Sequence, residues 1–245
     1  MTGIGRKTGV PKQNMHHLMS NSPWSGPALI ISVQDDIKTD RVTQVTDNLE
    51  FGFVAVPAWS PDGRQIVFSA ASTPRDPQKL YVIKADGSDL RQITSGDSYD
   101  HEAVWSPDGQ WIAFHHNCAL WLIRPDGSDA QELLVSDEFC TEVPTWSPDG
   151  QQIAFLYFQG GLARGIWVIN RDGSDPHEVY TFERRPERGW GVWSPDGRQI
   201  LSCYEEDGEW PCILVNADGS GEAQRVDWDP YWWSASFWPR WGRVD

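Results

Sequence analysis

The sequence predicts an all-β fold, a β-propeller built from four-stranded antiparallel blades, because two turn motifs repeat in step along its 245 residues. The run Trp-Ser-Pro-Asp-Gly occurs four times, with spacings of 46, 41 and 47 residues between its tryptophans: Trp59, Trp105, Trp146 and Trp193. Asp-Gly-Ser recurs once in each repeat, beginning at Asp86, Asp126, Asp172 and Asp218. A period of about 40–45 residues with strand and turn signals is typical of one propeller blade.

Each repeat is expected to contain four strands. Proline presets φ for a type I turn and glycine accepts positive φ, so Ser-Pro-Asp-Gly predicts a tight turn between the first and second strands. Short apolar runs rich in β-branched and aromatic residues predict the strands themselves. In the second repeat the expected strands are 102–105, 111–114, 119–123 and 132–135.

The whole chain, 1–245, is interpreted as one domain with a flexible tail at 1–11. The predicted full blades are 51–94, 99–135, 141–181 and 190–227. A degenerate fifth signature, Trp-Pro-Arg-Trp-Gly, begins at Trp238, 45 residues after Trp193. It suggests a composite closing blade made of 229–243 and 12–47, with 231–237, 15–19, 28–33 and 42–46 as its first to fourth strands.

Such a closure gives five blades, protects the open sheet edges and favours a monomer. The alternative is a fragment or truncated propeller.

The pattern Trp-Ser-Pro-Asp-Gly-x-x-Ile-x-Phe, followed by a strand and Asp-Gly-Ser, resembles the TolB-like β-propeller repeat, a WD-like repeat. The resemblance covers roughly residues 51–227. It implies a secreted or periplasmic protein and, often, a protein-interaction module; some similar propellers precede a serine-hydrolase domain, as in the prolyl oligopeptidase family. Five blades would depart from the six or more usual in the family. Residues 1–26 contain no apolar stretch typical of a secretory signal, so the compartment is left open.

Composition narrows the classes of partner. A formal net charge of −15 argues against nucleic acid and anionic membrane surfaces. No apolar run approaches the length of a membrane span. We find no Gly-x-Ser-x-Gly, phosphate loop or His-Glu-x-x-His, and expect no cofactor.

The favoured interpretation is a non-enzymatic scaffold that binds a protein or peptide. A carbohydrate-binding propeller, a structural or engineered ring without a ligand and, least favoured, a metal-dependent lyase are the alternatives.

Function is expected where the repeats differ, on the face opposite the Ser-Pro-Asp-Gly turns. Exposed aromatic side chains there favour recognition, although they could instead pad blade interfaces. The charged runs there are interpreted first as neutralising each other across neighbouring loops, and second as matching a charged partner. The ligand-binding candidates are Tyr99, His101, Glu102, Arg185, Arg188, Trp190 and Trp210. A metal is a weaker hypothesis that uses His101, His115 and His116, with Asp97 or Asp100.

The four cysteines can be read in two ways. In the blade arrangement Cys203 and Cys212 can face each other across a hairpin, and Cys118 and Cys140 lie near one face. Two disulfides, Cys203–Cys212 and Cys118–Cys140, are therefore possible and would imply an oxidising compartment. Four free cysteines fit the sequence equally well.

Overall fold

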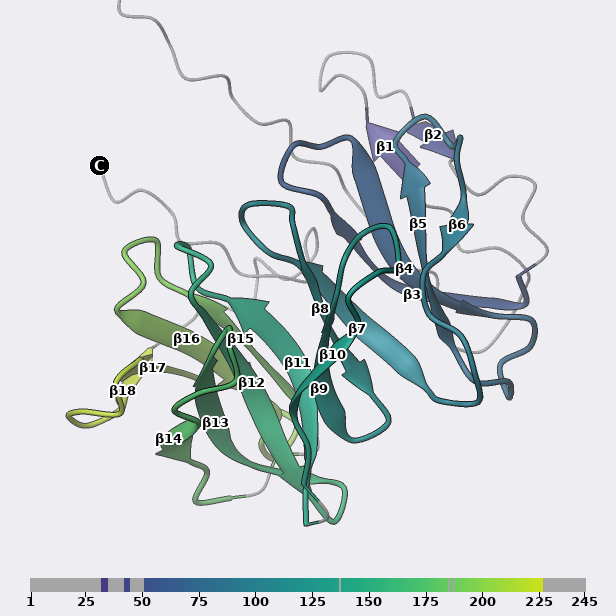
Figure 1. Cartoon of the computed structure of the whole chain (residues 1–245). Coiled ribbons are helices and arrows are strands. Elements are labelled where there is room, and N and C mark those ends of the chain that lie inside the picture. Colours follow the sequence, from purple (N-terminus) through teal and green to yellow (C-terminus); the bar gives the residue numbers. More distant parts are fainter. Residues whose placement is uncertain are drawn as a thin grey trace, which may run out of the picture.

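Four consecutive four-stranded antiparallel sheets make up the computed structural model, which describes residues 51–136, 138–184, 186 and 188–226, and the backbone of 32–34 and 42–44. We call these sheets blades I to IV (Figure 1). Blade I contains β3 (Phe53–Trp59), β4 (Gln65–Ala71), β5 (Lys79–Lys84) and β6 (Arg91–Gln92); blade II contains β7 (Asp100–Trp105), β8 (Ile112–His116), β9 (Ala119–Ile123) and β10 (Gln131–Leu134). Blade III contains β11 (Cys140–Trp146), β12 (Gln152–Gln159), β13 (Leu162–Asn170) and β14 (His177–Thr181); blade IV contains β15 (Gly189–Trp193), β16 (Gln199–Tyr204), β17 (Cys212–Asn216) and β18 (Gln224–Val226).

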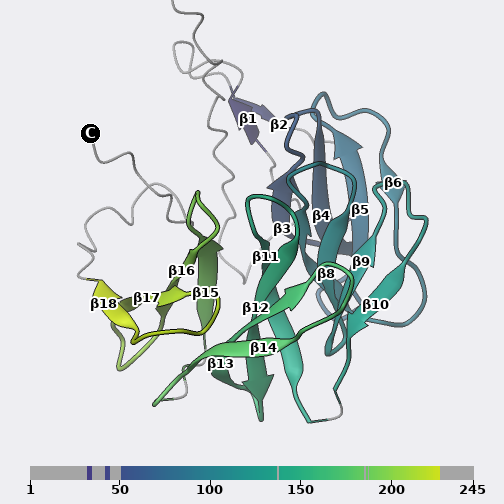
Figure 2. The ribbon, with the colours of Figure 1, turned by 60° about the vertical axis from the view of Figure 1, so that its left-hand side comes forward.

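The strands within each blade pair in chain order, so every neighbour in the sheet is a neighbour in sequence. The first strands contact one another in turn, β3 with β7, β7 with β11 and β11 with β15, and the blades stand side by side (Figure 2). This arrangement confirms the predicted all-β architecture of four-stranded blades. The described residues include no helix long and apolar enough to cross a bilayer.

The Ser-Pro-Asp-Gly runs form the same hydrogen-bonded turn in every blade. In blade I, Ser60 Oγ donates to Asp62 Oδ1 (2.7 Å) and accepts from the N–H of Gln65 (2.9 Å). The N–H of Gly63 closes the turn on the carbonyl of Ser60 (2.9 Å), with φ of 68° at the glycine. The left-handed backbone explains why glycine stands at this position of each repeat.

The signature tryptophans join each blade to the one before it. Trp105, Trp146 and Trp193 each donate their indole N–H to a carbonyl of the preceding blade: Ala58 O (3.1 Å), Val104 O (3.3 Å) and Thr145 O (3.1 Å). In all three cases the acceptor is the residue before the preceding blade's own signature tryptophan. The tryptophan period is therefore also the period of contact between blades.

The hydrophobic core lies between the sheets. One cluster joins Val67 and Leu80 of blade I to Ile112 and Phe114 of blade II, and equivalent clusters join blades II with III and III with IV. Blades II and III each bury one face against the blade before and the other against the blade after, so residues on both faces of their strands are apolar. The outer faces of blades I and IV, which have no neighbouring blade among the described residues, are the ones that the predicted closing blade would cover.

Two short strands lie near the N-terminus. β1 (Ser32–Gln34) and β2 (Val42–Gln44) pair antiparallel as a separate two-stranded sheet. They overlap the segments predicted as third and fourth strands of the composite blade, which would pair in this way. The other two segments, 15–19 and 231–237, lie outside the described residues, as do the tail at 1–11 and Trp238. The five-blade count and the ring closure remain predictions.

Candidate functional site

The end of each blade opposite the Ser-Pro-Asp-Gly turns is called here the loop end. It consists of the described residues of the connections and the strand residues adjoining them; the connections are 72–78, 93–99, 117–118, 135–139, 160–161, 182–188 and 205–211. The opposite end, which carries the four signature turns, is the turn end.

First strands of blades I–III share a β-bulge at the loop end. The register shifts between Ala55 and Ala58 in β3, between His101 and Val104 in β7, and between Glu142 and Thr145 in β11. The residue after the start of each shift has positive φ: 46° at Val56, 56° at Glu102 and 53° at Val143. Positive φ is costly for any residue with a Cβ, above all valine, so the surrounding fold imposes this backbone.

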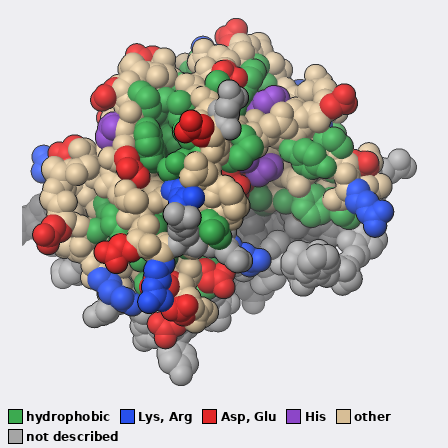
Figure 3. Space-filling model, turned by 90° about the horizontal axis from the view of Figure 1, so that it is seen from below, with side chains coloured by type: hydrophobic (Ala, Val, Ile, Leu, Met, Phe, Trp, Pro, Cys, Tyr) green, Lys and Arg blue, Asp and Glu red, His purple; other side chains and the backbone are tan. Residues whose placement is uncertain are grey.

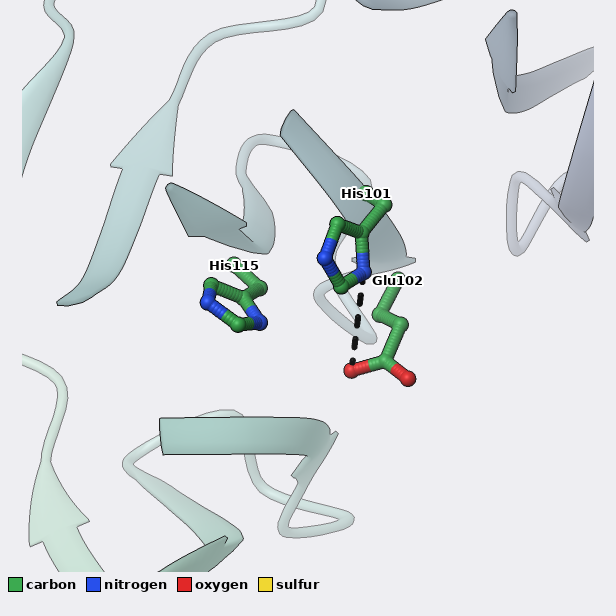
Figure 4. A group of neighbouring side chains, drawn as sticks. All are labelled: His101, Glu102 and His115. Atoms are coloured by element: carbon green, nitrogen blue, oxygen red, sulfur yellow. Dashed lines mark ion pairs between the residues drawn. The ribbon is translucent and has the colours of Figure 1, made fainter. Parts of the chain in front are cut away.

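In blade II the bulge brings three chemically active side chains together (Figure 4). His101 of β7 and His115 of β8 are directly opposite in the sheet register, with ring centroids 4.4 Å apart. The carboxylate of Glu102 lies 3.9 Å from His101 Nδ1. One ligand atom from each of His101, Glu102 and His115 lies within 4.8 Å of the others. We call these three residues the His-Glu-His cluster.

His115 is the most buried member, 4% exposed, and neither of its ring nitrogens has a hydrogen-bond partner among the described residues. Burial, together with the neighbouring His101 and His116, lowers the pKa of His115 to about 3. Burial also lowers the pKa of His101, against the opposing effect of Glu142 and Asp100. Both imidazoles are therefore neutral near pH 7 and able to act as ligands or hydrogen-bond partners.

A second carboxylate, Glu142 of blade III, lies near Glu102 and His101 of this cluster. Glu102 Oε2 accepts a hydrogen bond from the N–H of Val143 (2.7 Å), which links the bulge of blade II to the bulge of blade III. Burial raises the pKa of Glu102, although that hydrogen bond acts in the opposite direction. Burial and the nearby Glu102 raise the pKa of Glu142 to about 7, while His101 opposes the rise. The site thus concentrates acidic groups that lack a fixed cationic partner among the described residues.

His116 faces a different set of neighbours. Its Nδ1 is 2.7 Å from Asp100 Oδ1, and Asp100 Oδ2 accepts from Lys79 Nζ (3.1 Å). Lys79 Nζ also bonds the carbonyl and, at 2.9 Å, the hydroxyl of Ser98. Since the Asp100 side chain is 0% exposed and that of Lys79 only 10%, this network joins blades I and II in the interior. The structure therefore groups Glu102, not His116, with His101 and His115.

Other sequence-predicted candidates are spread along the loop end. Tyr99 is 45% exposed and its hydroxyl donates to the carbonyl of Arg75 (3.3 Å). Trp190 in β15 is half-buried, packs beside the buried pair Cys203 and Cys212, and its carbonyl accepts from Ser202 Oγ (3.0 Å). Trp210 is half-buried and Asp97 exposed.

Opposite charges meet in the loops of blades III and IV. Arg184 pairs with Asp207 (2.5 Å) and Glu206 (3.7 Å) across a shallow depression of about 340 Å³. Arg188 is exposed, and its carbonyl accepts from the N–H of Glu205 (3.0 Å). Arg185 lies outside the described residues. The Arg184 contacts are those expected if the basic and acidic runs neutralise each other.

Both cysteine pairs are joined in the structure. Cys118 and Cys140 link the β8–β9 connection to the start of β11, and Cys203 and Cys212 face each other across β16 and β17; both Cα–Cα distances are 4.1 Å. The first disulfide lies at the loop end and ties blade II to blade III beside the bulge of β11. An oxidising compartment remains a prediction.

Sequence reasoning missed two members of the site, Glu142 and Lys79. Glu142 could have been found by aligning the repeats on their tryptophans, because it occupies the position of His101, four residues before the signature tryptophan. Lys79 has no such signal. Its role depends on Asp100, a residue of the next blade that becomes its neighbour only in the folded protein.

Comparison with known proteins identifies the repeat. Residues 26–119 match the family model described as the TolB beta propeller domain. A segment of 56 residues is 37% identical to an uncharacterized peptidase of Bacillus subtilis, YuxL, and covers 23% of this chain and 8% of the peptidase.

Solved structures agree on the fold. TolB from Acinetobacter baumannii superposes with a TM-score of 0.62 at 18% identity, over 78% of this chain and 46% of that one. An oligogalacturonate lyase in complex with manganese superposes with a TM-score of 0.63 at 15% identity, over 78% and 57% of the two chains. The chain thus spans about half the length of these two structures and a small part of the peptidase, and the predicted TolB-like repeat is confirmed.

Proposed function

We propose that this chain, whose repeats and fold are those of TolB-type β-propellers, is a binding module that recognises a protein or peptide at its loop end. One observation carries the proposal. The large hydrophobic side chains exposed in the described residues are Val56 (37%), Tyr99 (45%) and Val135 (57%). Val56 lies at the bulge of β3, Tyr99 directly precedes β7 and Val135 directly follows β10. None belongs to a signature turn.

The surroundings of these residues fit a protein ligand. Exposed apolar side chains bordered by polar groups are typical of interaction sites, and tyrosine is enriched in them. Figure 3 shows a face of the molecule on which hydrophobic side chains and histidines lie next to carboxylates. Glu142, which has no hydrogen bond or ion pair to the described residues, supplies an acceptor for a basic or hydrogen-bond-donating group of the ligand.

The two ends of the blades differ in a way that supports this assignment. At the turn end the same hydrogen bonds recur in all four blades, so that side is uniform. At the loop end equivalent positions carry different residues on a shared bulge. A scaffold that keeps its backbone and varies its side chains at one end is suited to recognition.

The test is a selection of phage-displayed random peptides on the purified full-length chain. Selected peptides are then measured against a loop-end double variant, Tyr99→Ala with Val135→Ser, and a turn-end control, Arg64→Ala with Gln151→Ala. All four positions are exposed, so each double variant should keep its free energy of unfolding within about 1 kcal/mol.

We expect the loop-end variant to lose at least about tenfold in affinity, roughly 1.4 kcal/mol, and the control to lose none. If no peptide family is enriched, or if both variants bind equally well, the proposal is wrong.

A further inference from the structure

We propose that His101, Glu102 and His115 form a binding site for one divalent transition-metal ion, with Zn²⁺ as its most direct probe. The proposal is independent of a peptide ligand and concerns the His-Glu-His cluster of blade II alone. It starts from the donor set: two imidazole nitrogens and a carboxylate oxygen that lie within 4.8 Å of one another.

The β-bulge explains how consecutive residues can serve one ion. Side chains of neighbouring residues in a regular strand point to opposite faces of the sheet, so His101 and Glu102 could not both reach His115. The register shift after His101, with φ of 56° at Glu102, places an extra residue in the strand and reorients its side chain. Figure 4 shows the Glu102 carboxylate on the side of the two rings.

His115 supplies an observation that points to a ligand rather than to packing. It is 4% exposed, and within the described part of the chain both ring nitrogens lack hydrogen-bond partners. A buried polar group without a partner costs about 1–3 kcal/mol, so such groups are rare without a role. A metal ion bound to one nitrogen would remove that cost.

The donors also define the class of ion. Imidazole nitrogens suit zinc, copper, iron and nickel ions, whereas Ca²⁺, Mg²⁺ and Mn²⁺ prefer sites made of oxygen ligands. Three protein ligands leave coordination positions open for water or another small ligand. His101 and Glu102 keep 27% and 24% of their side chains exposed, which gives an ion a path to the buried His115.

The site is particular to blade II. At the three equivalent positions blade I has Ala55, Val56 and Ser69, and blade III has Glu142, Val143 and Leu156, on the same bulged backbone. The fold therefore does not require histidine or glutamate there. These neighbours also supply substitutions that the architecture already accommodates: His101→Ala, Glu102→Val and His115→Leu.

The experiment is a calorimetric titration of ZnCl₂ into the full-length chain after chelator treatment under non-reducing conditions, with the bound ion counted by elemental analysis. His16 and His17 are adjacent in the sequence and could bind zinc by themselves, so the titration is repeated with His16→Gln and His17→Gln. His177→Gln is the matched control. Among the described residues, the ring of His177 contacts the main-chain carbonyls of Asp175 and Ala217 and lies 3.9 Å from the Asp175 carboxylate, away from the cluster.

We expect one Zn²⁺ per chain for the wild type and for the control variants, with no comparable binding of Ca²⁺. His101→Ala and His115→Leu should each weaken zinc binding by more than about 100-fold, since loss of an outer-shell partner alone costs 10–100-fold. No stoichiometric zinc, or unchanged affinity in both cluster variants, would refute the site.

A measurement on the wild type tests the site without any variant, so that a folding defect cannot be mistaken for lost zinc binding. In ¹⁵N-histidine NMR spectra, Zn²⁺ should shift the imidazole nitrogens of His101 and His115 and leave those of His177 in place. Shifts confined to other histidines would overturn the assignment.

Discussion

The two ends of the blades shift the pKa values of their carboxyl groups in opposite directions. At the turn end, hydrogen bonds from the Ser60 hydroxyl and the N–H of Arg64 lower the pKa of Asp62, and the same arrangement lowers the pKa of Asp149 and Asp196. At the loop end, burial raises the pKa of Glu102 and Glu142. Each turn-end carboxylate has a hydroxyl and an N–H donor from its own turn. At the loop end, Glu102 has one N–H donor from the next blade, and Glu142 has no hydrogen-bond donor among the described residues.

This difference separates structure from function within one repeat. A group whose partners recur in every blade is part of the fold, and its replacement should affect stability in the same way in each blade. A group whose partners are missing or unique to one blade is available for a ligand. The following predictions test that division. The first concerns Asp100, which lies at the loop end but is buried and paired like a structural residue.

Asp100→Ala should have the largest effect. It removes the buried carboxylate that pairs with Lys79 Nζ at 3.1 Å and with His116 Nδ1 at 2.7 Å, and leaves the Lys79 charge in the interior. Breaking a buried pair in this way costs about 3–5 kcal/mol, to be measured by urea unfolding. The double variant Asp100→Leu with Lys79→Met should recover most of that loss. An effect below 1 kcal/mol would mean that this network does not join blades I and II.

At the turn end, Trp105→Phe, Trp146→Phe and Trp193→Phe should each destabilise the protein by about 1–3 kcal/mol, through a lost indole hydrogen bond and a small cavity. Their indoles bond equivalent carbonyls of the preceding blade, so the three losses should be similar. None should change the zinc affinity. Unfolding curves and zinc titrations on the same samples check both statements, and a large spread among the three would contradict the equivalence of the turn ends.

The features that recur in every repeat, namely the turns and the four strands of each blade, could be predicted from the sequence. Turn chemistry and period were enough for the four-stranded blades, because Ser-Pro-Asp-Gly forms its hydrogen bonds within a few residues of itself. His101, Glu102 and His115 were singled out because they lie at the variable end. The metal hypothesis already pairs His101 with His115, but with His116 as the third ligand. That Glu102 joins them could not be read from a strand pattern, since alternation would place consecutive residues on opposite faces.

Contacts between blades were beyond the reach of the sequence. Glu102 bonds the N–H of Val143, 41 residues away, and Lys79 meets Asp100 only when blades I and II pack together. The bulges of blades I and III carry a sequence signal, because Val56 and Val143 are each followed by a proline, and proline within a strand is typical of a bulge. Blade II lacks that signal, since Glu102 is followed by alanine. Aligning the repeats on the tryptophans would have revealed that position, but not its positive φ.

Acid should destabilise the loop end through His115. Its pKa is about 3 in the folded protein and near 6.5 when unfolded, so below pH 6.5 the unfolded chain binds a proton that the folded chain does not. In chelator-treated samples this costs about 2 kcal/mol between pH 6.5 and pH 5. His115→Leu should reduce the loss, while His177→Gln should not. Parallel pH slopes for the wild type and His115→Leu would show that His115 is not buried in its neutral form.

Glu142→Gln should have the smallest effect on the free energy of unfolding, and it should stabilise the protein rather than destabilise it. The pKa of Glu142 is about 7 in the folded protein, above the ordinary value of 4.5, so its contribution to stability is complete at low pH and is lost as the pH rises through 7. Glutamine should therefore stabilise the protein at pH 8, by about 1 kcal/mol because the partly exposed group is screened by solvent, and should make no difference at pH 4.

Urea unfolding at the two pH values measures this, with Glu132→Gln, at an exposed position of β10, as the control. A gain that is equal at both pH values would mean that Glu142 does not titrate near neutrality. A bound cation beside Glu102 would weaken the preference for an uncharged side chain at position 142, because a nearby positive charge favours the charged form of a carboxylate. Repeating the pH 8 measurement with Zn²⁺ therefore links the smallest stability effect to the ion proposed for the His-Glu-His cluster: the advantage of glutamine should shrink when zinc is present.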